Sequence, residues 1–497
     1  TFRRNRPEFS QSATRNCNCG KPAALTLGVV DGFNSGIGGG CFMLIRKPDG
    51  TIIAIDGRET APAAVSRDMY LRDGKAKPEL SRTGALAIGV PGALSAYDLA
   101  IREYGKLDLA EHLGQAATIA EVGFKLDDAY LRRLGQAVKK LRKFPDSARI
   151  FLAPDGSAWP NGHRLKQPDL AKSYLKIARH TADWFYRGPF ALKTERWMSE
   201  NGGLITREDL SGFNTKRREP VRTKYRGHEI VGFPPPSSGG VHVAQILNIL
   251  EAFDLRSMPP RSPEFVHHVA EAMRLAFADR AHWLGDADFV PVPKGLASKQ
   301  YARELAKKID PKKAATIPGH ATPPNADSDL FGKHTTHFST TDSDGWWVAC
   351  TATVNTTFGS GVVLPGTGIV MNNQMDDFSA QPGMPNAFGL IGAEANQSIM
   401  ITRRKEFGFG AGYKNTNVNT LFANSMMVLD GADHRRARRA VLLDRRAHAH
   451  PVELRRRALG QVKRLDLLDD GEFLWPVFHD HFDSFQVPAA SCQEFVE

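Results

Sequence analysis

Long apolar runs and paired cysteines are both scarce in this sequence. No stretch of about 20 apolar residues appears among the 497 residues, so the sequence predicts no membrane-spanning helix. The cysteines are odd in number and scattered: Cys17, Cys19, Cys41, Cys350 and Cys492. Without a second pair at metal-site spacing, they favour neither a metal site nor a disulfide. We expect no metal ion and no cofactor, and cysteine usage leaves the redox compartment open.

The composition is that of a large globular protein, with 41% hydrophobic and 24% charged residues. Strand-like segments near both ends of the chain flank a helical middle, Leu94 to Leu305. This order predicts an α+β fold in which both halves contribute strands to stacked sheets of one layered domain.

The segment His334 to Ser339, HTTHFS, separates two kinds of sequence. Residues 317–334 are rich in Pro, Gly, Asp and Asn, which predicts a linker without regular structure. Two β-runs follow, Thr336 to Thr341 and Trp346 to Asn355, joined by a turn at 342–345. A Thr-Thr pair commonly opens a strand through propensity alone. If the bond before Thr335 is cut, however, its α-amino group, with a pKa of roughly 7.7–8.0, can take the proton from its own hydroxyl.

Three further motifs bear on the fold and the site. Glycines at 36 and 38–40 lead into the strand-like CFMLIR without a following Lys-Ser/Thr, so they predict close backbone packing and not a phosphate loop. PPPSSGGVH predicts a rigid turn before an amphipathic helix with an apolar stripe between Val241 and Leu250. The amide and carboxylate cluster at 372–377 is either a solvated loop or a set of acceptors aimed at a ligand ammonium group.

At these residues the sequence resembles the γ-glutamyltransferase family, the glutathione hydrolases of the N-terminal-nucleophile hydrolase superfamily. The likeness includes NSGIGGGCFMLIR (Asn34 to Arg46), DGRETAP (Asp56 to Pro62), PPPSSGGVH, TTHFS and NNQMDDFS, in the family's order across residues 24–396. It implies a four-layer αββα sandwich, one domain built from two autoprocessed subunits, residues 1–334 and 335–497, with cleavage between His334 and Thr335.

The resemblance also assigns roles to single residues. Thr335 matches the nucleophile, and Thr353 matches the threonine that hydrogen-bonds it. Arg58 matches the arginine that grips the substrate α-carboxylate, as a planar guanidinium can. The remaining matches are Asn355, Gln374 and Asp377, which hold the glutamyl α-amino and α-carboxylate groups, and Phe388, in a covering loop where relatives often have Tyr. Without the resemblance, the residues allow other interpretations: Arg58 and Glu59 fit a surface ion pair, and Asp377 fits a helix cap or turn cap.

The implied activity is hydrolysis or transfer of the γ-glutamyl group of glutathione-like substrates, with amino acids or peptides as acceptors. Related enzymes acting as cephalosporin (glutaryl) acylases or γ-polyglutamate depolymerases are the alternatives within the family. The expected partners are these small molecules and the two subunits of the same precursor, with no nucleic acid. Relatives are often periplasmic or secreted, which this sequence itself does not show; it begins at Thr1 without a signal-like segment, as expected of a processed chain or a fragment.

Two segments depart from the family. Residues 1–22 lack its usual opening, and residues 397–497 lack both its Ser-Ser-Met run and the Gly-Gly pair that forms its oxyanion hole. The second segment is instead rich in arginine and contributes to a net charge of +11. Three alternatives explain this segment: genuine divergence from the family, a basic interaction segment, or a shifted reading frame. An unprocessed, inactive homologue with a basic binding tail therefore stays open as a non-enzymatic alternative.

Overall fold

The computed structural model describes residues 20–66, 68–284, 287–288, 292–314, 335–378, 387 and 426–429. Its helices are α1 (Gly20–Val30), α2 (Glu79–Arg82), α3 (Ala93–Tyr104), α4 (Leu109–Val122), α5 (Asp128–Leu141), α6 (Pro145–Phe151), α7 (Pro168–His180), α8 (Asp183–Tyr186), α9 (Pro189–Glu200), α10 (Arg207–Ser211), α11 (Ser238–Leu250), α12 (Pro263–Trp283) and α13 (Lys299–Ala306), with 3-10 turns η1 (Ala85–Ala87), η2 (Lys294–Ala297) and η3 (Gln374–Asp377). Among these residues no helix is both long and apolar enough to cross a membrane.

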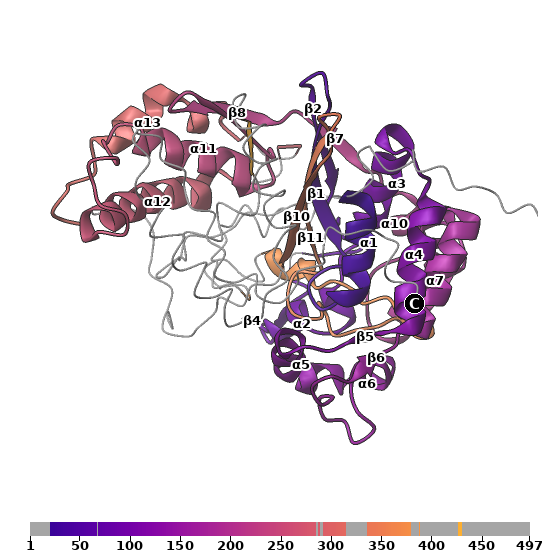
Figure 1. The fold of residues 1–497 in the computed structure, drawn as a ribbon. Helices are drawn as coiled ribbons and strands as arrows, with labels where there is room; N and C mark the ends of the chain where they lie inside the picture. Colours follow the sequence, from indigo (N-terminus) through magenta and orange to yellow (C-terminus); the bar gives the residue numbers. More distant parts are fainter. Residues whose placement is uncertain are drawn as a thin grey trace, which may run out of the picture. The chain divides into compact units, whose positions relative to one another are not determined.

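The strands are β1 (Gly40–Arg46), β2 (Ile52–Gly57), β3 (Leu71–Arg72), β4 (Lys75–Ala76), β5 (Phe124–Lys125), β6 (Arg164–Leu165), β7 (Lys216–Arg218), β8 (Val221–Tyr225), β9 (His228–Gly232), β10 (Thr335–Thr341), β11 (Trp347–Thr353) and β12 (Met426–Leu429). The largest sheet has the order β10-β11-β1-β2-β7. Its strands come from both halves of the chain and lie side by side in Figure 1. This confirms the predicted mixture of helices and strands, although a second large sheet is not among the described residues.

The β10–β11 hairpin forms as its sequence predicts. Thr335 to Thr341 pairs antiparallel with Thr353 to Trp347. At the turn, the Asp342 carboxylate accepts hydrogen bonds from the backbone N–H groups of Asp344 and Trp346, both at 3.0 Å. Gly345 has φ +91, a left-handed conformation that costs glycine little. The strand begins one residue earlier than predicted, so Thr335 itself lies in the sheet.

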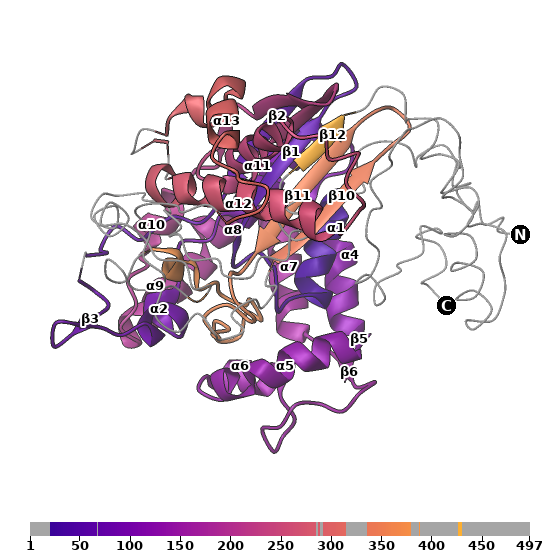
Figure 2. The same cartoon turned by 90° about the vertical axis from the view of Figure 1, so that its left-hand side faces the viewer.

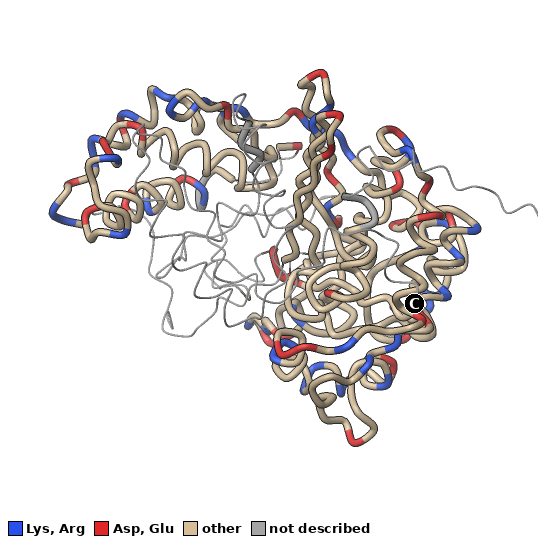
Figure 3. The backbone as a smooth tube through the Cα atoms, viewed as in Figure 1, with Lys and Arg blue, Asp and Glu red and all other residues tan. Residues whose placement is uncertain are grey.

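One face of the large sheet packs on α1 and α3, with α4 and α7 behind them (Figures 1 and 2). Cys41, Met43, Cys350 and Ala352 point from β1 and β11 into this main hydrophobic core. Along the strands the backbone tube in Figure 3 is mostly free of charged residues, which lie mainly on the helices and loops. Burial of apolar surface against these helices therefore fixes which face each strand residue occupies.

Two expectations about the middle of the chain were wrong. It contains strands β5 to β9 as well as helices, because VRTKY and HEIVG are rich in β-formers and flank the turn Arg226-Gly227, both with positive φ. Helix α11 is not amphipathic in its packing: every residue from Gly239 to Leu250 is buried. Its polar Asn248 is accommodated by hydrogen bonds with Thr223 and the carbonyl of Ala297.

Candidate functional site

Thr335 and Thr353 lie directly opposite each other across the β10–β11 ladder. The Thr335 hydroxyl donates to Thr353 Oγ1 at 3.5 Å. Thr353 Oγ1 also accepts the backbone N–H of Asn355 at 2.8 Å, which orients that hydroxyl. The pairing register thus brings the two predicted threonines together without any contribution from loop conformation.

The same row of the sheet continues to Arg58. Thr353 pairs with Gly40 on β1. Cys41 pairs with Gly57 on β2, so the same register continued by one residue places Gly40 opposite Arg58. A Cβ at Gly40 would lie 2.3 Å from Glu59 Oε2 and 3.1 Å from Arg58 Cα, so only glycine leaves room here. With strands about 4.8 Å apart, Thr335 and Arg58 are separated by three strand spacings, or about 14 Å.

These residues share the sheet face opposite α1, which we call the Thr335 face. Side chains that are directly opposite in a ladder point the same way, and those two residues apart along a strand do too. Phe42 therefore lies on this face, where it stacks on Phe233 with ring centroids 4.3 Å apart. The Arg58 guanidinium lies 5.6 Å from the centre of the Phe42 ring, which places it on the Thr335 face as well.

Arg58 is held between two carboxylates. Its Nε lies 2.9 Å from Glu59 Oε1, and it also forms an ion pair with Asp377. The Arg58 side chain is 13% exposed, and those of Glu59 and Asp377 are 2% and 3% exposed. The interpretation of Arg58-Glu59 as a surface pair was therefore wrong, because the end of β2 is covered. Sequence reasoning missed Glu59 as a member of the site.

Burial dominates the electrostatics of this cluster. It raises the pKa of Asp377 to about 7, although the Arg58 charge works in the opposite direction and the carboxylates of Glu59 and Asp376 add to the rise. Burial also raises the pKa of Glu59, again against the influence of Arg58. One guanidinium thus faces more negative charge than it can neutralise, which favours a ligand that brings a cation.

Gln374 Oε1 and Asp377 Oδ1 are among the buried acceptor atoms of the cluster that have no hydrogen-bond partner in the described part of the chain. Both residues belong to η3, and both are buried. Buried polar atoms are normally paired, because leaving one unpaired costs about 1–3 kcal/mol. These two oxygens are therefore suited to receive donors from a ligand.

The neighbouring amides shape the backbone. Asn372 donates to the carbonyls of Gly38 and Gly89 at 2.8 and 2.9 Å and accepts from the N–H of Gly89. Asn355, with φ +81, donates to the carbonyl of Asn373 at 3.0 Å. The 372–377 segment is thus neither a solvated loop nor wholly free for ligands, since Asn372 bonds to Gly38 and Gly89 and the carbonyl of Asn373 bonds to Asn355.

Lys140 on α5 holds the loop that follows Asn355. Its Nζ donates to the carbonyls of Thr357 and Gly359 at 2.7 and 2.6 Å. Phe358 and Gly359 have φ +57 and +50, so this loop is strained at a non-glycine residue. Burial lowers the pKa of Lys140 to about 8. No sequence signal marked this lysine, because it lies more than 200 residues away in the chain.

His337 also lies on the Thr335 face, two residues after Thr335. Its Nδ1 is 2.8 Å from Thr351 Oγ1 and its Nε2 is 3.2 Å from Ser339 Oγ. Burial lowers the pKa of His337 to about 4, so the ring is neutral at pH 7. A neutral ring adds a polar contact next to the threonine pair without adding charge.

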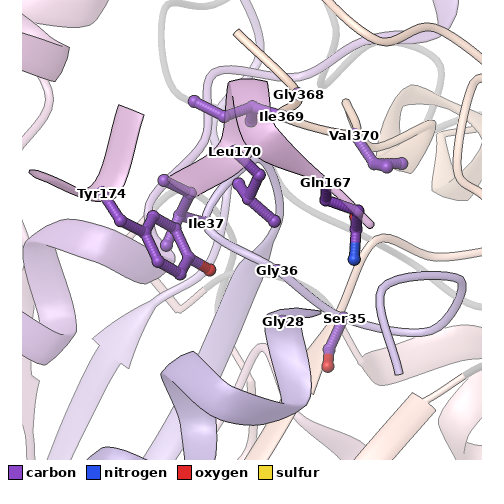
Figure 4. A pocket seen from close by; sticks show the side chains of 10 residues that line it. All are labelled: Gly28, Ser35, Gly36, Ile37, Gln167, Leu170, Tyr174, Gly368, Ile369 and Val370. Atoms are coloured by element: carbon purple, nitrogen blue, oxygen red, sulfur yellow. The ribbon is translucent and has the colours of Figure 1, made fainter. Parts of the chain in front are cut away.

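Several predicted positions lie outside the described residues: His334, Phe388, the 317–334 linker, residues 1–19 and all but four residues of 397–497. Within the described part, no group of three His, Cys, Asp or Glu side chains is placed to hold a metal ion. A small pocket between α1 and α7 is lined by Gly28, Ser35, Gln167, Tyr174 and neighbouring residues (Figure 4). It contains none of the predicted site residues, so we regard it as a packing gap.

Comparison with known proteins identifies the family. A family model described as Gamma-glutamyltranspeptidase matches residues 22–405. The chain belongs to this family. The match to the family model extends slightly beyond the motifs that the sequence analysis found between residues 24 and 396.

Curated relatives of this gamma-glutamyltranspeptidase family member include two kinds of proenzyme. The chain is 42% identical over 362 residues to the glutathione hydrolase proenzyme of Escherichia coli (strain K12), covering 72% of this chain and 62% of that protein. It is 39% identical over 368 residues to the Acylase ACY 1 proenzyme of Pseudomonas sp. (strain SE83), covering 72% and 64%. The chain therefore spans less than two thirds of the length of these relatives.

Solved structures show a matching mixed α+β fold. Gamma-glutamyltranspeptidase from Helicobacter pylori aligns with a TM-score of 0.58 and 37% identity, covering 60% of this chain and 85% of that one. Cephalosporin acylase from Bacillus halodurans aligns with a TM-score of 0.64 and 26% identity, covering 79% and 68%. The fold is thus common to both activities, and side-chain chemistry has to distinguish them.

Lys140→Met tests whether α5 supports the site loop. The substitution removes the donor to two carbonyls, so we expect the free energy of unfolding to fall by about 1–3 kcal/mol. We also expect faster hydrogen exchange at the N–H of Gly361, which donates to Phe358. Lys139→Met, on the exposed side of the same helix, is the matched control. Equal stability and exchange in both variants would show that Lys140 does not hold the loop.

Proposed function

We propose that this chain is a γ-glutamyl hydrolase and transferase acting on glutathione-like substrates through an ester on Thr335. The observation that carries the proposal is the row from Thr335 and Thr353 to Arg58. It ends in a buried cluster with unpaired acceptors on Gln374 and Asp377. A nucleophile thus stands at one end of the row and an amino-acid recognition site at the other.

The proposed maturation is a cut between His334 and Thr335. The Thr335 hydroxyl oxygen attacks the carbonyl carbon of His334, the peptide C–N bond breaks, and water hydrolyses the resulting ester. Cleavage of the C–N bond frees the α-amino group of Thr335, and hydrolysis of the ester divides the chain into subunits of residues 1–334 and 335–497. Both subunits remain parts of one four-layer αββα sandwich. The position of Thr335 at the start of β10 supports this, since a cut there leaves the new terminus directly opposite Thr353.

In turnover, the free α-amino group accepts the proton from the Thr335 hydroxyl, whose oxygen attacks the γ-carbonyl carbon of the substrate. The amide C–N bond breaks, the amine leaves with a proton, and the γ-glutamyl group remains as an ester. Water or an acceptor amine then attacks this ester, which releases glutamate or a new γ-glutamyl amide. Once the Thr335 proton has moved to the α-amino group, the Thr353 hydroxyl turns to donate to the Thr335 oxygen, and we expect their 3.5 Å separation to shorten when substrate is bound.

The charge cluster favours a zwitterionic head. The α-carboxylate of a glutamyl group pairs with Arg58, and its α-ammonium donates to Asp377 Oδ1 and Gln374 Oε1. A glutaryl group has the carboxylate but no ammonium. It would compete with Asp377 for Arg58 and leave a buried carboxylate unpaired, which is costly. This argues for γ-glutamyl amides over the glutaryl amides of an acylase.

Self-cleavage is the direct test of the proposed maturation. We expect denaturing electrophoresis of purified protein to show two polypeptides, with Edman sequencing of the smaller giving Thr-Thr-His-Phe-Ser. Thr335→Ala removes the attacking oxygen and is expected to remain a single chain without hydrolase activity. A folded wild-type protein that stays uncut after long incubation would rule out the proposal.

A pair of inhibitors tests the recognition of the head group. Asp377 is ionised above its pKa of about 7 and protonated below it. The ammonium of L-glutamate needs the ionised form, so its inhibition constant is expected to fall about tenfold between pH 6 and pH 8. Glutarate, which differs only in lacking the ammonium, is expected to bind less tightly as pH rises through the same range.

Asp377→Asn serves as the control, because it keeps the size of the side chain and removes its titration. We expect both pH trends to disappear in this variant. The same trend for glutamate and glutarate in the wild-type enzyme would contradict the assignment of Asp377 to the ammonium.

A further inference from the structure

The side chain of Thr336, next to the nucleophile, points to the opposite sheet face. Thr336 pairs with Ala352, which lies in the core packed under α1. The Thr336 hydroxyl donates to Asp31 Oδ2, just beyond the last residue of α1. This contact joins the first turn after α1 to the head of β10, across some 300 residues of sequence.

The same turn also holds the end of β11. Asn34 Nδ2 donates to the two oxygens of Asp31 at 3.1 and 3.4 Å. The carbonyl oxygen of Asn34 accepts the backbone N–H of Val354 at 2.9 Å. The turn at residues 31–34 therefore bonds to Thr336 and to Val354, the immediate neighbours of Thr335 and Thr353.

We propose that Asp31 and Asn34 form a bracket, bonded to Thr336 and Val354, which sets the distance between the Thr335 and Thr353 hydroxyls from the opposite face of the sheet. Neither residue can touch the substrate, because α1 and the Thr335 face are on different sides of the sheet. Both are positioning residues. The inference rests on the proposed function for its consequence in catalysis, but the bracket itself is a structural claim.

The bracket matters because β10 is the outermost of the described strands in its sheet and Thr335 is its first described residue. An edge strand has a ladder on one side only, and its end frays readily. After cleavage before Thr335, no chain on the N-terminal side would restrain the nucleophile. The Asp31 carboxylate, with a pKa raised by burial to about 6, is ionised at neutral pH and is a strong acceptor for the Thr336 hydroxyl.

Three substitutions on one strand separate the bracket from general stability. Thr336→Val keeps the shape of the side chain and removes the hydroxyl, whereas Thr336→Ser keeps the hydroxyl. Thr340→Val removes a hydroxyl from the same face of β10, four residues away from the contact with Asp31. Asp31→Ala removes the acceptor and the link to Asn34.

In the full-length chain, we expect Thr336→Val and Asp31→Ala to slow self-cleavage by about tenfold, because losing the free energy of one charge-assisted hydrogen bond corresponds to about this factor in rate. In processed enzyme, we expect kcat on a γ-glutamyl anilide to fall by a similar factor while KM changes little, because the head-group cluster is untouched. Thr336→Ser is expected to restore both rates, and Thr340→Val to match wild type. Wild-type rates in Thr336→Val would overturn the proposal.

Hydrogen exchange at the Val354 N–H tests the bracket even if the proposed function is wrong. If the wild-type protein neither cuts itself nor hydrolyses γ-glutamyl amides, the proposed function fails, but the bracket still predicts faster Val354 exchange in Asp31→Ala than in wild type. Unchanged exchange at Val354 would overturn the bracket whatever the activity of the chain.

Discussion

The backbone ladder between β10 and β11 is the constraint on which the rest of the site depends. It sets Thr335 opposite Thr353, and through β1 it aligns both with Gly40 and Arg58. Because side chains alternate along a strand, a slip of one residue would send Thr335 into the core under α1 and bring Thr336 to the substrate side. Phe338 on β10, which packs against the core on the α1 face, opposes that slip because the slip would turn it to the other face.

The second requirement is electrostatic. A single guanidinium, that of Arg58, is buried with the two carboxylates of Glu59 and Asp377, and burial raises the pKa of Asp377. Such a site is unfavourable when empty and becomes favourable when a ligand supplies the missing cation. Gly40 makes the cluster possible, since any side chain there would collide with Glu59. The proposed recognition site and the proposed nucleophile are thus linked through one row of backbone.

The sequence was most informative where a residue's role depends on its neighbours in the chain. The β10–β11 hairpin followed from strand propensity and the Asp342 turn, and the glycines before β1 from the strand that follows them. The position of Arg58 came from the family resemblance. Lys140 and Asp31 were missed because each acts through a partner far away in sequence. Glu59 was missed because a neighbouring Arg-Glu pair is ordinary on a protein surface. Burial of α11 on every face was also unpredictable, since it depends on packing against α12, α13 and β8.

The proposed mechanism passes through an ester at Thr335, and mass spectrometry can locate this ester. Wild-type protein would be mixed briefly with a γ-glutamyl anilide, quenched in acid, digested and sequenced by fragmentation. We predict that one γ-glutamyl group is attached to the peptide that begins Thr-Thr-His-Phe-Ser, on its first residue, and that Thr335→Ala carries none. Steady release of the aniline with the adduct on another residue, or with no adduct at any quench time, would contradict the proposed mechanism.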